Sequence, residues 1–331
     1  MRRVGSVQLK AFNPEPSARE EDRDHRRRWL RGKHRRRWLR VKRCMSGLLG
    51  GLLLAVVAGC RPPAEGVCME GSDTMINLAE AWAEKYHASH PEAMIQVSGG
   101  GSGVGIASLI DGNCDIASAS RKMKDKEIER VLVKRGQEAR EIIVGYDALA
   151  VYIHKDNPLD SISLEELAEI YGEGGKITRW SQLGVDPKRL GNDTIIRVSR
   201  QNSSGTYVYF REAVMGKARD YKLGSIDQNG SVDVVALVAH TPSAIGYSGM
   251  GYAMPGVKML RISKHKGGSG VAPTFENALK REGGYPITRP LLLYTAGEPK
   301  DKARELLDWI LDVPGQAVVK ELGYVPLPTH E

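Results

Sequence analysis

The fold is predicted mainly from the stretch of residues 66–120, which reads GVCMEGSDTMINLAEAWAEKYHASHPEAMIQVSGGGSGVGIASLIDGNCDIASAS. Its runs of apolar and small residues at 66–70, 93–99 and 113–120 are typical of buried strands. After the first run, apolar residues recur at helical spacing and share one face: Ile76, Ala79, Trp82, Ala83 and Tyr86. A second helix is predicted after GGGSG. Strands that alternate with helices across short glycine-rich turns predict an α/β fold with a largely parallel sheet.

A second alternating series follows an extended run at 141–159 that leads the chain out of the first unit. Strands and helices are predicted in turn at 164–172, 194–200, 207–216, 231–241, 244–249 and 290–297, with two amphipathic helices between 301 and 324. This order predicts two lobes, each a mainly parallel sheet flanked by helices, joined by two chain crossings. We expect lobe 1 at 66–146 and 260–331, and lobe 2 at 147–259.

The net charge of +8 is concentrated at the front of the chain. Residues 1–59 hold 16 Lys and Arg against 5 Asp and Glu, which leaves 32 basic and 35 acidic residues from position 60 onward. The body therefore has a net charge of −3. A nucleic-acid partner would require a basic stripe on the folded part. We expect no such partner.

Residues 46–60, SGLLGGLLLAVVAGC, form an apolar run that is too short to span a bilayer and is typical of a signal-peptide core. Its end, Val57-Ala58-Gly59-Cys60, resembles the bacterial lipobox. The resemblance implies cleavage before Cys60, a lipid on Cys60 and a short tether at 60–65. We expect an exported lipoprotein, periplasmic or on the outer cell surface, held to the membrane at Cys60.

The leader before this run contains RRRWLR twice, at 26–31 and 35–40. One interpretation is an overlong basic signal-peptide region. Another takes Met45 as the true start, so that residues 1–44 are not translated. The repeated unit also resembles a twin-arginine export signal.

Two cysteines belong to the expected folded part, Cys68 and Cys114. Each comes a few residues before a glycine- or serine-rich loop, on strands that can be neighbours. In an exported domain two such cysteines pair as a disulfide or stay as buried free thiols. Both alternatives remain open at the level of the sequence.

Three loops share one design, in which a strand ends, small hydroxyl or glycine residues follow, and a helix begins. A helix N-terminus presents free backbone N–H groups and a partial positive charge, so it attracts a compact anion. Glycine admits close approach, and Ser and Thr hydroxyls add donors. For any one loop ordinary helix capping is the stronger explanation, but three together favour an anion site. The candidate residues are Ser72, Asp73, Thr74, Ser102, Gly103, Ser204, Gly205 and Thr206.

Two arginines strengthen the anion hypothesis. Arg121 directly follows DIASAS, which ends in Ser120, and Arg200 stands four residues before Ser204. A guanidinium can give a tetrahedral oxyanion two charge-assisted hydrogen bonds. We add Ser120, Arg121 and Arg200 to the candidate site.

As a set, GSDTM, GGGSG, DIASASR and the R-x-x-x-SGT of Arg200 to Thr206 resemble the phosphate-binding lipoproteins of bacterial phosphate ABC transporters. The resemblance covers roughly residues 66–331. It implies a two-lobed periplasmic-binding-protein fold of the two-crossing type that closes on inorganic phosphate. It also implies delivery to an ABC permease and ATPase complex, a monomer, and no enzyme activity, cofactor or metal. Phosphate binding is implied for Ser72 and Thr74, for Ser102, and for Arg200, Ser204, Gly205 and Thr206.

One position departs from the best-known family site. Where those members have an Asp that accepts the proton of phosphate, this chain has Ser120. Selectivity against sulfate then needs another acceptor, and Asp73 is our hypothesis because it lies in the first loop. A helix-capping carboxylate is the equal alternative for Asp73.

Other classes of site find little support. The GGGSGVG run does not complete a G-x-S-x-G nucleophile motif, because position 104 is Val, and no P-loop or strict G-x-G-x-x-G is present. His87 and His90 lack a third ligand nearby. The remaining alternatives are a receptor for another oxyanion, such as sulfate or molybdate, and a phosphate-sensing scaffold lipoprotein.

Overall fold

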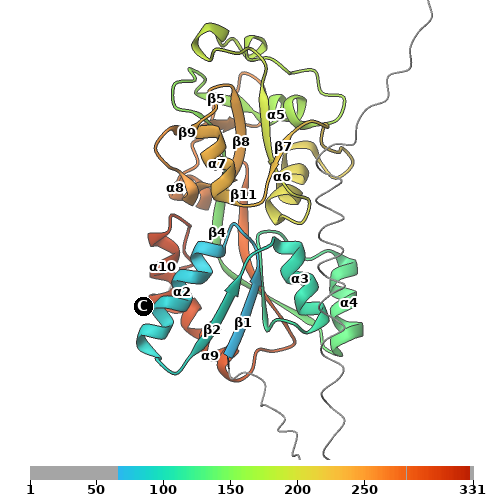
Figure 1. Cartoon of the computed structure of the whole chain (residues 1–331), viewed down its shortest axis with the longest axis vertical. Helices are drawn as coiled ribbons and strands as arrows, with labels where there is room; N and C mark the ends of the chain where they lie inside the picture. Colours follow the sequence, from blue (N-terminus) through green and yellow to red (C-terminus); the bar gives the residue numbers. More distant parts are fainter. Residues whose placement is uncertain (1–65, 281, 329–331) are drawn as a thin grey trace, which may run out of the picture. The chain divides into compact units, whose positions relative to one another are not determined.

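Two long strands, β4 (Ala139–His154) and β11 (Thr288–Ala296), run antiparallel through the middle of the molecule (Figure 1). The structure is a computed structural model, and it describes residues 66–280 and 282–328. Among these residues nine strands join in one sheet, in the order β2-β1-β3-β11-β4-β8-β6-β7, with β9 pairing to β4. The leader and Cys60 lie outside the described residues.

The first half of the sheet has three parallel strands next to the antiparallel β11. β1 (Gly66–Gly71) lies between β2 (Met94–Ser98) and β3 (Ile116–Ala119) and is parallel to both, while β3 pairs with β11. The helices of this half are α2 (Ile76–Ser89), α3 (Ser102–Asp111), α4 (Asp125–Arg135), α9 (Asp301–Leu311) and α10 (Val313–Glu321).

The second half grows from the other end of β4. There β4 pairs antiparallel with β8 (Ala244–Gly249), and β6 (Ile196–Arg200) is parallel to both β8 and β7 (Ile226–Gln228). Its helices are α5 (Leu164–Tyr171), α6 (Gly205–Met215), α7 (Ser231–Ala239) and α8 (Phe275–Leu279), with short 3-10 turns η1 (Trp180–Leu183), η2 (Pro187–Arg189) and η3 (Met250–Tyr252).

The predicted helices and strands occur where the periodicity placed them, with boundaries shifted by a few residues. α2 buries Leu78, Ala79, Trp82 and Tyr86, and the indole N–H of Trp82 donates to Gly315 O in α10 at 2.9 Å. Of the predicted face, Ala79, Trp82 and Tyr86 are buried, whereas Ile76 and Ala83 are only partly buried and Leu78 is buried in addition. Within each half the strands other than β4 and β11 pair in parallel with one another, as the alternation of strands and helices predicts, whereas the pairings of β4 and β11 are antiparallel.

The segment after residue 259 lies differently from its predicted place. β9 (Val257–Met259) pairs with β4, and β10 (Arg261–Ser263) pairs with β5 (Ser161–Ser163), inside the range assigned to lobe 2. By strand pairing the second crossing is therefore β11 and not the chain near residue 260. The sequence did not show this, because VKMLRIS is short enough to pair with either half.

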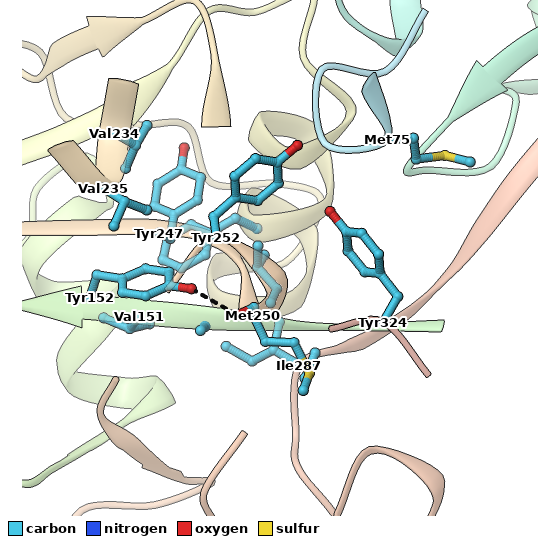
Figure 2. Close-up of a cluster of buried hydrophobic side chains, with 14 of the residues drawn as sticks. Met75, Val151, Tyr152, Val234, Val235, Tyr247, Met250, Tyr252, Ile287 and Tyr324 are labelled. Atoms are coloured by element: carbon cyan, nitrogen blue, oxygen red, sulfur yellow. Dashed lines mark hydrogen bonds between the residues drawn. The ribbon is translucent and has the colours of Figure 1, made fainter. Parts of the chain in front are cut away.

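A buried cluster of tyrosines and aliphatic side chains lies where the halves meet at β4 (Figure 2). Tyr252 and Tyr324 direct their hydroxyls to the loop after β1, and each donates to Thr74 O, at 2.9 and 2.6 Å. Tyr252 also donates to Asp73 O at 2.9 Å. The core thus holds the backbone of this loop from beneath.

In the described part of the chain, no helix has the length and apolar character needed to cross a membrane.

Candidate functional site

The loop 71–74 after β1 is fixed by the neighbouring strand β3. Gly71 has φ +144°, and a Cβ there would come within 2.2 Å of Ser118 O, so only glycine fits. The backbone N–H of Ser72 donates to Ser118 O at 3.0 Å and to Ser118 Oγ at 2.9 Å. The Ser72 hydroxyl donates to Ser120 Oγ at 3.0 Å. The pairing of β1 with β3 therefore brings the GSDTM loop next to the DIASASR segment.

The loop 99–102 before α3 joins the same group. Gly101 N donates to Gly71 O at 2.8 Å, which ties this loop to the first. Ser102, the first residue of α3, is fully buried, and its Oγ accepts from Ser120 N at 3.0 Å. Three serine hydroxyls, of Ser72, Ser102 and Ser120, thus gather beside the N-terminus of α3.

The loop 203–206 before α6 comes from the other half of the sheet and meets α3 end to end. Gly103 N donates to Ser203 O at 2.9 Å. Ser204 caps α6 by accepting from Thr206 N at 3.2 Å. A Cβ on Gly205 would lie 2.3 Å from Ser102 Oγ and 2.7 Å from Ser120 Oγ, so the approach requires glycine. Two helix N-termini with their partial positive charges therefore face one group of hydroxyls.

Thr74 and Thr206 meet directly across the halves. Their hydroxyl oxygens lie 2.7 Å apart, and Ser231 Oγ, at the first residue of α7, is 3.5 Å from Thr74 Oγ1. Both threonines and Ser231 are buried. Each hydroxyl can donate one hydrogen bond and accept others, so the set can rotate to fit the oxygens of an anion.

Arg200, at the end of β6, is fully buried beside these hydroxyls. It donates to Asp73 Oδ2 at 2.8 Å, Ser231 Oγ at 2.9 Å and Asn229 O at 2.6 Å. Burial lowers the pKa of its guanidinium, and the Asp73 carboxylate opposes this. Its Nε–H is buried without an acceptor among the described residues, a state that costs about 1–3 kcal/mol. Arg200 can therefore still give a hydrogen bond.

Asp73 is held on both oxygens. Oδ1 accepts from Gly100 N at 2.8 Å and Oδ2 accepts from Arg200. Asp73 thus links the first two loops to the arginine of the other half. This contact gives it a positioning role besides the acceptor role expected from the sequence.

The guanidinium of Arg121 bonds to Glu127 and not to the serine and threonine hydroxyls. Its NH1 and NH2 groups donate to the two carboxylate oxygens of Glu127 at 2.7 and 2.8 Å. Burial raises the pKa of the Glu127 carboxyl, but the hydrogen bonds and the charge of Arg121 outweigh it, and the pKa is lowered. Arg121 therefore gives none of these hydrogen bonds to the serine and threonine hydroxyls.

The sequence analysis missed two fully buried charged residues at the site, Arg289 on β11 and Asp147 on β4. Arg289 donates through NH1 to Thr206 Oγ1 at 3.0 Å and through NH2 to Asp147 Oδ2 at 2.8 Å. It also missed Ser231. The sequence did contain one signal, a single charged residue in each of the apolar runs YDALAVY and RPLLLY. Because a buried charge without a partner is very costly, two such charges in buried strands indicate an ion pair.

Cys68 and Cys114 are both free thiols in this structure, and Cys114 is buried whereas Cys68 is only partly buried. Asp115 faces Cys68 in the strand pair, since its N–H donates to Cys68 O at 3.0 Å. Cys114 Sγ lies 3.8 Å from Gly105 O. Burial raises the pKa of the Cys114 thiol to about 12, so it is protonated at neutral pH.

No group of three or more His, Cys, Asp or Glu that could hold a metal occurs among residues 66–280 and 282–328.

Comparison with known proteins gives the family. The chain matches the PBP superfamily domain over residues 57–313. The chain belongs to this superfamily. Among curated members, the phosphate-binding protein PstS of Pseudomonas aeruginosa is 34% identical over 268 residues, 78% of this chain and 82% of that protein. The protein SphX of Synechococcus elongatus is 33% identical over 272 residues, 79% and 77% of the two chains.

Solved superfamily structures agree. A Clostridium perfringens protein described as a substrate-binding protein of a phosphate ABC transporter, with bound phosphate, has a TM-score of 0.69 at 29% identity, over 80% of this chain and 100% of that one. A phosphate transport receptor of Vibrio cholerae has a TM-score of 0.62 at 27% identity, over 79% and 100%. The family resemblance and the periplasmic-binding-protein fold predicted from the sequence are confirmed.

Proposed function

We propose that this protein binds inorganic phosphate at the cluster of serine and threonine hydroxyls between α3 and α6 and delivers it to an ABC permease. One observation carries the proposal. Four segments from distant parts of the chain bring together five buried hydroxyls, those of Ser72, Thr74, Ser102, Ser120 and Thr206. The buried Arg200 bonds to Asp73 in the first of these segments and to Ser231, whose Oγ lies 3.5 Å from Thr74 Oγ1. Donors that are fixed before the ligand arrives lose little entropy on binding.

The contacts of these serine and threonine hydroxyls support binding rather than catalysis. The hydroxyls bond to each other, to backbone and to arginine, and within the described residues none lies beside a histidine or a free carboxylate that would activate it as a nucleophile. The relatives named above are described as binding proteins and transport receptors. We infer that the protein has no enzyme activity of its own.

The organisation of the protein follows from this proposal. We infer lobe 1 at 66–146 and 288–328 and lobe 2 at 147–287, with β4 and β11 as the crossings, because the strand pairing divides there. Gly103 and Ser203 then form a contact between closed lobes. We further propose export as a monomer with a lipid anchor at Cys60, supported by the apolar run and VAGC.

The test is a calorimetric titration of the purified full chain in detergent against phosphate, sulfate and molybdate. We expect phosphate to bind with the highest affinity. Binding of none of the three by a folded protein would refute the proposal. Tighter binding of sulfate or molybdate would instead assign the site to another oxyanion, and a chromogenic phosphate ester that stays intact would support the absence of enzyme activity.

A further inference from the structure

Arg289 and Asp147 form an ion pair at directly opposed positions on the two crossing strands. Both side chains are fully buried, and Asp147 Oδ2 accepts from Arg289 Nε at 3.1 Å and NH2 at 2.8 Å. Such a pair rarely adds net stability, because removing two charges from water costs about as much as their attraction returns. Folding alone therefore does not explain the pair.

The two charges lie at different distances from the site. Arg289 donates from NH1 to Thr206 Oγ1 at 3.0 Å and to Ser120 O at 3.2 Å, and from NH2 to Thr74 Oγ1 at 3.4 Å. Asp147 has its other contact at Met250 N, 3.2 Å away in η3. The positive end of the pair thus faces the hydroxyls, and the negative end lies behind it.

The bonds from Arg289 also set the direction of the threonine hydroxyls. A guanidinium can only donate, so Thr74 and Thr206 accept from Arg289 with a lone pair. Their protons are then free to point toward each other or toward a bound anion. One of the two protons lies in the 2.7 Å hydrogen bond between the threonines, so both can turn toward an anion only when that bond opens.

We propose that Arg289 is a specificity-determining residue, which through Thr74 and Thr206 makes the site prefer a doubly charged oxyanion to a singly charged one. This inference rests on the proposed function, since it concerns which protonation state of phosphate is bound. The attraction between a fixed charge and a ligand grows in proportion to the charge of the ligand, and it is strong where water is excluded.

Burial raises the pKa of the Asp147 carboxyl, and the charge and hydrogen bonds of Arg289 and the hydrogen bond from Met250 N oppose this. Tyr209 has its ring centre 5.7 Å from the guanidinium carbon, and burial raises the pKa of Tyr209, Tyr252 and Tyr324 further above neutrality. The charged groups facing the site are the two pairs, Arg289 with Asp147 and Arg200 with Asp73. Because the double variant described next has neither Arg289 nor Asp147, the ionisation of this pair cannot contribute to the pH dependence of the variant.

The test removes both charges together. In Arg289→Met combined with Asp147→Asn, no buried charge is left unpaired, and Asn can still accept from Met250 N. Phosphate dissociation constants are measured by calorimetry at about pH 5.5 and about pH 8.5, at fixed ionic strength. We expect the variant to lose on the order of tenfold affinity for the monoanion at low pH and on the order of a hundredfold for the dianion at high pH.

Arg289→Lys is the charge-keeping control and should retain the preference for high pH. If the first variant does not fold, Arg289→Gln with Asp147→Asn, whose amides can bond to each other, carries the same expectation. Equal losses at both pH values, or no loss, would overturn the inference while wild-type binding still supports the proposed function. Failure of the wild type to bind phosphate at either pH would overturn both.

Discussion

The residues at the site are held in place mainly by hydrogen bonds to one another. Asp73 receives a hydrogen bond on each carboxylate oxygen, from Gly100 N and from Arg200. Arg200 in turn holds Ser231, and Arg289 holds Thr206. Since these residues are hydrogen-bonded to one another, changing one of them is expected to alter the ligand affinity through its neighbours as well as directly.

Asp73→Asn separates two roles for this carboxylate. If Asp73 acts by positioning Arg200, phosphate and sulfate affinities change together, and we expect their ratio to stay within about twofold of wild type. The measurement is a pair of titrations at pH 7. A loss of affinity confined to phosphate would instead support the acceptor role that the sequence suggested.

Gly205→Ala tests the close approach of α6 to α3. The new Cβ would lie 2.3 Å from Ser102 Oγ, so the two helix ends must separate. We expect phosphate affinity to fall on the order of a hundredfold, in line with the cost of overpacking. Gly103→Ala is the control on the facing helix, because its Cβ would keep 3.1 Å from Ser203 O, and it should lose less. Equal effects would contradict this geometry.

At the scale of helices and strands, the loop design was readable from the sequence and the crossing strands were not. Ser102 and Ser204 stand at helix starts, where local sequence determines the capping, so their motifs predicted their place. Arg289 and Asp147 meet only because β11 and β4 pair in one register. That register depends on contacts 142 residues apart, which no local pattern contains.

Helix α3 offers a matched pair of serines for testing its N-terminal role. Ser102 is the first residue of the helix and belongs to the cluster of hydroxyls, whereas Ser108 lies near the C-terminal end of the helix, against the Cys114 thiol. We expect Ser102→Ala to lower phosphate affinity about fivefold, the effect of one lost hydrogen bond of about 1 kcal/mol. Ser108→Ala should leave the phosphate affinity unchanged. Titration calorimetry of both variants decides, and a larger loss for Ser108→Ala would place the ligand elsewhere.

At the scale of the whole molecule, the site joins segments from both halves of the sheet. A ligand that bonds to both halves stabilises the folded protein by mass action, about 2.7 kcal/mol at a hundred times its dissociation constant. We expect phosphate to raise the thermal unfolding midpoint of the wild type. Arg200→Gln should abolish most of that rise, and an undiminished rise would show that phosphate binds away from Arg200.

A crystal structure of the protein grown with phosphate would show whether phosphate binds where α3 and α6 meet. We predict a phosphate that accepts hydrogen bonds from Arg200 and from the hydroxyls of Ser102 and Thr206, with Arg289 behind Thr206 and out of contact with it. Phosphate bound elsewhere, or a site in which Thr74 and Thr206 still bond to each other with no anion beside them, would contradict the account.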